Sequence, residues 1–488
     1  MTRLGCIVSA SAYVPRLRLP REVIANAMSW ATGGAGKPKG ARSICNWDED
    51  SLTMGVEAAR GALPRSGAPV NAVAMASTTL PFADRSNAAL AAACLDLGAD
   101  VETQEFGGTL RAGTTALANA ARREGRTLVV ATDSRAAMPG SAQEAAFGHG
   151  AAALVIDGAA SSRELPVPDA ALASVLGTGH VAANFVDHYR MAGSDFDYAL
   201  EERWVRDAGL AALPARAIGQ ALIQAGVAAR DVRHFVMPGS AANLKRIAKS
   251  AGLDPDVQLA DPLQADCGDT GSAHALLMLV GALERALPGE LILLASFGQG
   301  VDALLLRVEP GVAAWRAQQR PLSMTLARRQ VETQYTRYLS HAGLLQVDFG
   351  MRAERDNRTA QSVAWRKHEM LDAFRGGKCR RCAAVQFPLS RVCVNPDCRE
   401  TDTQDSFRLA DSTGRVKTFT EDWQAYSRRP PYVYGNVSFA EGGNLFMEFT
   451  DLDAGELAVG DSLRFVLRIK DQDALRGFRR YFWKAARA

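Results

Sequence analysis

Four of the eight cysteines of this chain lie between residues 379 and 398, and this cluster constrains the fold more than any other feature. They form two pairs, Cys379-x2-Cys382 and Cys393-x4-Cys398. Two thiolate hairpins at this spacing can close a tetrahedral shell of four sulfurs around Zn²⁺, which leaves no open position for catalysis. A redox-active iron site of the rubredoxin type is the alternative. The pattern therefore predicts a structural zinc ribbon over residues 376–402.

The rest of the chain has the composition of a multidomain globular protein. Its 488 residues are 47% hydrophobic and 22% charged, and a chain of this length divides into about three or four domains. No apolar stretch approaches the roughly 20 residues of a membrane span, and Pro15 ends the N-terminal run before a signal peptide could develop. Clustered cysteines favour a metal site in a reducing compartment over disulfides. We therefore expect a cytoplasmic protein without a membrane partner.

The charge pattern argues against nucleic acid as a partner. The formal net charge is only +3, and no block of Lys and Arg interleaved with aromatic residues precedes the C-terminal run 476–484. We interpret that basic, aromatic run as a strand that packs against its own domain.

Residues 1–308 alternate between short apolar runs and amphipathic stretches, which is typical of an α/β fold. Several runs predict buried strands, and several stretches between them predict helices. The predicted strands are 127–132, 151–156, 234–238, 291–296 and 303–308, and the predicted helices are 112–123, 241–251 and 273–287. Each of two halves, 1–165 and 166–308, ends in a strand, a glycine turn and a strand. This repetition suggests an internal duplication.

The C-terminal third changes character twice. Residues 309–375 are richer in Arg and Gln and predict a helical connector. After the cysteine cluster, residues 403–488 alternate apolar and polar residues with a period of two, which predicts a small antiparallel barrel. Its predicted strands are 415–420, 434–439, 445–449 and 462–468.

This C-terminal part resembles the OB-fold zinc proteins that accompany thiolases. The resemblance rests on the cysteine pairs with Phe387-Pro388 between them and on the strand Gly414-Arg-Val-Lys-Thr-Phe-Thr420, and it covers residues 330–488. It implies a module that shapes or gates an acyl-CoA channel and performs no chemistry itself.

Residues 1–308 are similar to 3-hydroxy-3-methylglutaryl-CoA synthases and to β-ketoacyl-ACP synthase III, two members of the thiolase superfamily. Four stretches carry the similarity in the expected order: 76–83, 105–117, 266–273 and 296–300. The similarity implies a duplicated thiolase fold with αβαβα layers and a CoA thioester as substrate. It also implies pairing through an edge strand into a homodimer or a larger assembly.

The departures from these synthases fall on the catalytic positions. The resemblance implies a nucleophilic cysteine at the turn 107–110, which here reads Gly-Gly-Thr-Leu. The general-base glutamate position falls on Thr78 or Thr79, and no histidine occurs around 236–238. The usual asparagine of the third stretch is Asp269.

Four residues are therefore the candidate catalytic groups: Asp269, Cys267, Thr109 and His188. Cys267 lies beside Asp269 on a turn that faces the active site in thiolase-like enzymes, although packing in the core is the alternative. His188 is suited to proton transfer near neutral pH, although a surface loop is the alternative. Thr109 belongs to the elbow that lacks its cysteine.

Two functions remain open from the sequence. The first is an enzyme that makes or breaks a carbon–carbon bond in an acyl-CoA, by acyl transfer or by aldol chemistry. Steroid side-chain aldolases resemble thiolases, lack the cysteine and work with an OB-fold zinc partner, so the missing thiol is compatible with this function. The second is a non-catalytic CoA-binding subunit that supports a second thiolase-type subunit.

Overall fold

The computed structural model of the chain describes residues 4–32, 38–63, 68–158, 167–254, 256–354, 358, 360–473 and 475–488. These residues divide into two compact units. The first unit holds most of the chain up to Tyr338. The second comprises Leu339–Ala488 with two short segments, Trp47–Glu49 and Leu90–Gly98.

Ten strands of the first unit form a sheet in the order β12-β11-β13-β14-β8-β1-β7-β6-β4-β5. The strands of its N-terminal half are β1 (Gly5–Tyr13), β4 (Ala72–Ala76), β5 (Glu102–Phe106), β6 (Gly125–Ser134) and β7 (His149–Gly158). Those of its C-terminal half are β8 (Ala173–Ala182), β11 (His234–Val236), β12 (Gln258–Leu259), β13 (Leu291–Phe297) and β14 (Gly300–Val308).

The two halves of this sheet have the same topology. If the strands of each half are numbered along the chain, both halves have the order 3-2-4-5-1 from the outer edge to the middle. The halves are joined by the antiparallel pairing of β1 with β8, which spans Gly5–Ile7 and Ala173–Val175. The duplication expected from the sequence is therefore present in the strand order.

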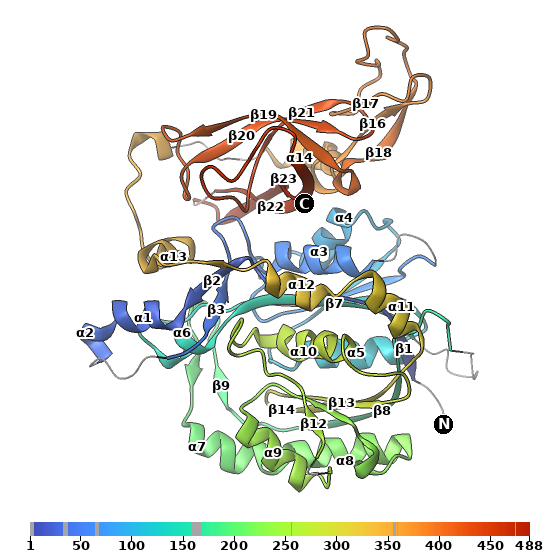
Figure 1. Cartoon of the computed structure of the whole chain (residues 1–488), viewed down its shortest axis with the longest axis vertical. Helices are drawn as coiled ribbons and strands as arrows, with labels where there is room; N and C mark the ends of the chain where they lie inside the picture. Colours follow the sequence, from blue (N-terminus) through green and yellow to red (C-terminus); the bar gives the residue numbers. More distant parts are fainter. Residues whose placement is uncertain are drawn as a thin grey trace. The chain divides into compact units, whose positions relative to one another are not determined.

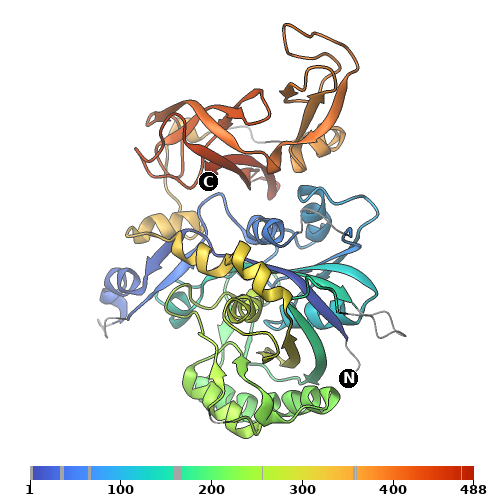
Figure 2. The ribbon, with the colours of Figure 1, turned by 45° about the vertical axis from the view of Figure 1, so that its right-hand side comes forward.

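Helices α5 (Ala112–Arg122) and α10 (His274–Leu283) lie between the two halves of the sheet (Figures 1 and 2). Helix α10 contacts β7 of one half and β11 and β13 of the other, and all its residues are buried. Its run of apolar side chains explains this position, because a helix that is apolar on every side needs burial on every side. On the outer faces, α3 (Ser51–Ala62) packs on β1, β6 and β7, and α8 (Leu213–Ala225) packs on β8, β13 and β14.

Smaller elements complete the first unit. They include a three-stranded sheet of β15 (Gln330–Val331), β2 (Leu17–Pro20) and β3 (Ala41–Ile44), and a hairpin of β9 (His188–Tyr189) and β10 (Tyr198–Ala199). The other α-helices up to residue 341 are α1 (Arg21–Ala27), α2 (Ser29–Thr32), α4 (Asn87–Cys94), α6 (Ala142–Ala146), α7 (Glu202–Trp204), α9 (Ala241–Ser250), α11 (Gly311–Gln318), α12 (Pro321–Ala327) and α13 (Tyr335–His341). Most of α4 and the end of α13 belong to the second unit.

Beyond residue 341, the described part of the second unit contains a three-stranded sheet, a five-stranded antiparallel sheet and two short α-helices. The small sheet is β17-β16-β18, with bounds Val385–Gln386, Arg375–Cys379 and Gln404–Arg408. The larger sheet is β21-β20-β19-β22-β23, with bounds Asn444–Glu448, Tyr432–Phe439, Gly414–Asp422, Ser462–Asp473 and Phe478–Arg487. The helices are α14 (Gln361–Arg366) and α15 (His368–Asp372). A bridge between Phe449 and Ala485 brings the chain just beyond β21 to β23, as closure into a barrel requires.

The core of the second unit is aromatic. Phe374 is fully buried and stacks on Trp483 at 6.2 Å between ring centroids, while Phe465 and Phe482 meet it edge-on at 5.7 Å. Aromatic pairs in these geometries stabilise a core beyond the area that they bury. Phe374 precedes β16, so residues of the predicted connector supply the centre of this core.

Candidate active site and metal centre

The turn between β5 and α5 forms the elbow at which the resemblance implied a cysteine. Here the Thr109 hydroxyl donates to the Gly298 carbonyl at 2.6 Å, and Arg111 Nε donates to the same oxygen at 3.1 Å. A Cβ at residue 298 would lie 2.7 Å from Thr109 Oγ1, so a side chain there would displace the Thr109 hydroxyl. The elbow and the last glycine loop, two of the four similar stretches, are therefore in direct contact.

A buried carboxylate, Asp302 of β14, holds the start of α5. It accepts hydrogen bonds from Arg111 at 3.1 Å, from Thr114 and Thr115, and from His180 Nδ1 at 2.9 Å. Burial alone raises the pKa of Asp302, but the hydrogen bonds from His180 and Thr115 and the Arg111 charge outweigh it and keep the pKa below its usual value.

The proton of His180 can be assigned from the same network. Arg122 Nη2 lies 2.8 Å from His180 Nε2, and a guanidinium can only donate. Nε2 therefore accepts, and the proton on Nδ1 is donated to Asp302. Asp302 and His180 were not predicted as site residues, although a lone Asp within the apolar strand 300–308 is a signal in the sequence.

A second buried carboxylate, Asp133 at the end of β6, fixes the stretch that carries the general base in the synthases. Its oxygens accept from the hydroxyls of Ser77, Thr78 and Thr79 at 2.9 to 3.1 Å and from the backbone N–H of Thr78 and Ser272 at 2.7 Å. The threonine hydroxyls at the general-base position therefore donate hydrogen bonds to a carboxylate inside the protein. Asp133 also joins this stretch to the turn at 268–272.

Cys267 lies inside the protein. It is fully buried, and its Sγ is 3.4 Å from the Leu263 carbonyl and 3.5 Å from that of Gly268. Burial raises the pKa of its thiol to about 12, and the Asp266 carboxylate adds to the rise. A nucleophilic cysteine needs an exposed thiolate. The burial of Cys267 therefore favours the packing alternative over a role as a nucleophile.

Asp269, two residues further on, is half-buried. Its Oδ1 accepts from the Gly271 N–H at 2.8 Å, and its backbone exchanges hydrogen bonds with Ala146 and Gly148. These bonds fix the turn and leave the second carboxylate oxygen available.

His188 lies on the β9–β10 hairpin, against the last glycine loop. Gln299 Nε2 donates to its backbone carbonyl at 3.2 Å, and its Nδ1 lies 2.7 Å from Asp187 Oδ2. The structure therefore brings His188 and Thr109 to the same loop, 298–299. Cys267 and Asp269 belong to a different stretch, 266–273, which is bonded to Asp133 through the Ser272 N–H.

A surface cavity of about 400 Å³ opens beside the short edge strand β12. Its lining includes His234, Leu244, Pro262 and Arg285. None of the candidate catalytic residues is part of this lining.

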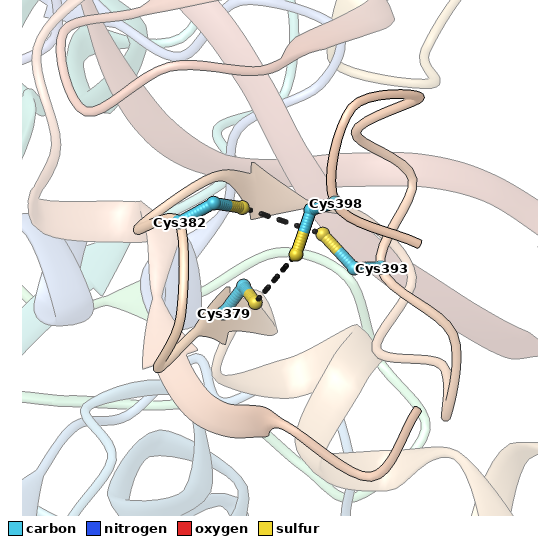
Figure 3. A group of neighbouring side chains, drawn as sticks. All are labelled: Cys379, Cys382, Cys393 and Cys398. Carbon is cyan, nitrogen blue, oxygen red and sulfur yellow. Dashed lines mark hydrogen bonds between the residues drawn. The ribbon is translucent and has the colours of Figure 1, made fainter. Parts of the chain in front are cut away.

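The four cysteines of the predicted ribbon converge, as Figure 3 shows. Their Sγ atoms all lie within 4.8 Å of one another; Cys379 and Cys398 are 3.9 Å apart, and Cys382 and Cys393 are 3.5 Å apart. A tetrahedral Zn–S shell with bonds of about 2.3 Å has sulfurs about 3.8 Å apart. The four thiols therefore fit a tetrahedral metal ion, and the sequence placed all four correctly in one group.

The duplicated sheet with two buried helices defines a thiolase-type domain, and solved structures share this architecture. MvaS in complex with 3-hydroxy-3-methylglutaryl coenzyme A superposes with a TM-score of 0.57 at 18% identity, covering 71% of this chain and 93% of that one. The 3-oxoacyl-(acyl carrier protein) synthase III of Pseudomonas aeruginosa PAO1 superposes with a TM-score of 0.52 at 20% identity, covering 63% and 99%. The expected fold class is confirmed.

In sequence, the chain is similar to hydroxymethylglutaryl-CoA synthases. That of Aeropyrum pernix is 29% identical over 355 residues, covering 69% of this chain and 93% of the relative. That of Thermococcus sibiricus is 27% identical over 347 residues, covering 69% and 95%. No protein-family model matches the chain. Among the described residues, no helix is both long enough and apolar enough to span a bilayer.

Proposed function

We propose that the chain is an enzyme that makes or breaks a carbon–carbon bond in an acyl-CoA, and that it does so without an acyl-enzyme. Similarity to hydroxymethylglutaryl-CoA synthases over 69% of the chain supports the substrate class. The positions of two stretches support the second part, because residues 107–111 contain no cysteine and Cys267 is buried. Aldol or retro-aldol chemistry needs only oxyanion stabilisation and a proton shuttle.

Two of the candidate residues can move protons in this mechanism. Asp187 accepts from Nδ1 of His188, which leaves Nε2 with its lone pair as a base. Asp269 uses Oδ1 for its own turn, while its Oδ2 has no hydrogen-bond partner among the described residues, so Asp269 is the second candidate acid or base. Thr109 has its hydroxyl committed to Gly298, so we assign it the role of positioning the glycine loop.

A cleavage assay tests this function. Purified protein is incubated with a series of 3-hydroxyacyl-CoA thioesters, and the shortened acyl-CoA and the released carbonyl compound are measured by mass spectrometry. We expect cleavage, with His188→Ala and Asp269→Ala each lowering kcat/KM by about 100-fold, the scale of a positioned acid or base. Asp100→Asn, an exposed change in the same unit, is the matched control.

A binding subunit is the second candidate, and the simultaneous change of the Cys, Glu and His positions favours it. In that case the chain alone cleaves none of the thioesters but still binds CoA in calorimetry. Turnover would then appear only when a second thiolase-type subunit is added. This pair of results would replace the enzymatic proposal.

We also propose that Zn²⁺ occupies the four-cysteine group as a structural ion and that residues 403–488 form an OB-fold module. Four thiolates with no open position suit a structural rather than a catalytic ion, and they suit the reducing cytoplasm. A homodimer through β5 is the proposed assembly, because β5 ends the ten-stranded sheet and has only β4 beside it among the described strands. Light scattering should give twice the chain mass of 52.2 kDa, and a monomer at micromolar concentration would contradict this assembly.

A further inference from the structure

The hairpin that carries His188 has little regular structure of its own. Its strands β9 and β10 have two residues each, with Tyr198 paired to Tyr189 and Ala199 to His188. A two-stranded hairpin is marginally stable in water even when it is longer. Contacts outside the ladder must therefore fix residues 187–199.

One carboxylate of the hairpin, Asp197, makes a largely buried ion pair of this kind. Its Oδ2 accepts from Nε of Arg135 at 3.2 Å and from Nη2 of the same guanidinium, and its Oδ1 lies 3.4 Å from Nε of Arg190. The side chains of Arg135 and Asp197 are only 6% and 8% exposed. Arg190 in turn donates to the backbone carbonyl of Thr78. Asp197 thus connects the hairpin to the end of β6 and to the general-base stretch.

The same contacts reach the other two loops of the site. The Arg135 guanidinium lies 3.6 Å from the ring centroid of Phe147, which forms a bridge with Asp269. The carbonyl of His188 accepts from Gln299 of the last glycine loop. The hairpin is therefore bonded directly to 76–83 and 296–300, and it is connected to 266–273 through Arg135 and Phe147.

We propose that Asp197 is a positioning residue. Its ion pair with Arg135, called the latch below, fixes the hairpin and so holds the Asp187–His188 pair beside the glycine loop. The catalytic consequence rests on the proposed function, whereas the latch itself does not. The physical basis is the cost of leaving Arg135 buried without its carboxylate, which favours an open hairpin once Asp197 is neutral. An open hairpin misplaces His188 and admits water to the reacting atoms.

The test compares Asp197→Asn with Asp195→Asn by hydrogen exchange. Asp195 lies exposed in the same hairpin, so its substitution removes the same charge without touching the latch. In Asp197→Asn we expect the amides of residues 187–199 to exchange at least about tenfold faster, while β6, β7 and α10 keep their protection. Asp195→Asn should behave like the wild type. Asp197→Glu should restore most of the protection, because it restores the charge.

Kinetics distinguish positioning from simple loss of structure. We expect Asp197→Asn to lower kcat by about tenfold or more while KM for the acyl-CoA changes by less than about threefold, since the hairpin positions the base rather than the CoA. Arg190→Gln, which leaves the Arg135 pair intact, should have a smaller effect on both exchange and kcat.

Two exchange results would overturn the latch: unchanged exchange in 187–199, or faster exchange throughout the first unit, which would mean a general structural role. If the wild type cleaves no acyl-CoA but the local exchange difference is present, the proposed function fails and the latch stands. If the wild type is active and the exchange is unchanged, the proposed function stands and the latch fails.

Discussion

A single buried side chain, Asp302, holds the start of α5 through hydrogen bonds with Arg111, Thr114 and Thr115 and also binds His180. Its carboxylate neutralises Arg111 at the start of α5 and sets the proton of His180 on Nδ1. A residue that satisfies a cation, an imidazole and two hydroxyls is costly to change, because each partner then remains buried without a bond.

Asp302→Asn should therefore destabilise the first unit strongly. Removing one partner of a buried ion pair costs about 3–5 kcal/mol, and we expect the lower part of this range because the Arg111 side chain is 20% exposed. Urea unfolding measures the change. Asp157→Asn, which breaks a more exposed pair with Arg126, should cost less than about 1 kcal/mol. Equal effects of the two substitutions would show that burial of Asp302 is not what matters.

Cys267 gives a second prediction at this scale. Because its thiol is buried with a pKa of about 12, it should react with iodoacetamide in the native protein at least about 100-fold more slowly than in urea. Mass spectrometry of the labelled peptides measures both rates. Fast native labelling of Cys267, together with loss of activity, would restore it as a nucleophile.

At the scale of elements, periodicity predicted those strands and helices that carry a continuous apolar run. The predicted strands 127–132, 151–156, 291–296 and 462–468 lie within β6, β7, β13 and β22, and the helix 112–123 matches α5 closely. The β9–β10 hairpin was not predicted, because two-residue strands held by Asp197 leave no periodic signal. For the same reason His188 was selected for its chemistry, proton transfer near neutral pH, rather than from a pattern of strands.

The zinc ribbon is an element whose fold should depend on its ion. Purified protein should contain about one zinc per chain by elemental analysis, and Cys393→Ser should unfold the second unit while the first unit keeps its protection in hydrogen exchange. Cys94→Ser, a buried cysteine outside the ribbon, is the matched control and should keep its zinc. Absence of metal together with disulfides among the four cysteines would contradict the assignment.

The sheet of the second unit should also lose stability in acid through Glu448. Burial by itself raises the pKa of this carboxyl, but Lys484 and Lys470 outweigh burial and lower it to about 2. Because the folded-state pKa lies below the ordinary value, the ionised group stabilises the fold above about pH 4.5, and this stabilisation falls as the pH decreases toward 2.

Between pH 7 and pH 3 the loss from this one group should be about 2 kcal/mol. Urea unfolding of the full chain at both pH values, followed by fluorescence, measures it. Glu448→Gln is less stable at pH 7 but should lose less stability between the two values. Identical losses for wild type and Glu448→Gln would refute the role of this carboxylate.

At the scale of the whole molecule, the duplicated strand order brings the loops of the candidate site together whether or not the elbow carries a cysteine. Each half contributes a buried helix and the loops at its start, so the meeting of elbow, turn and glycine loop is a property of the topology. That part of the site was accessible from the sequence through four similar stretches. The chemistry could not be predicted from the sequence, because it depends on whether a thiol is exposed or buried. The sequence alone does not give the surroundings of Cys267.

The central claim is that carbon–carbon bond chemistry here proceeds without an acyl-enzyme, and covalent labelling tests it most directly. The protein is incubated with radiolabelled acetyl-CoA or with the labelled thioester that it cleaves, then denatured in acid and separated on a gel. We predict turnover of the thioester with no label on the protein band, in the wild type and in Cys267→Ala alike. A stable labelled adduct that maps to any cysteine of the first unit, and that disappears when this cysteine is replaced, would contradict the account.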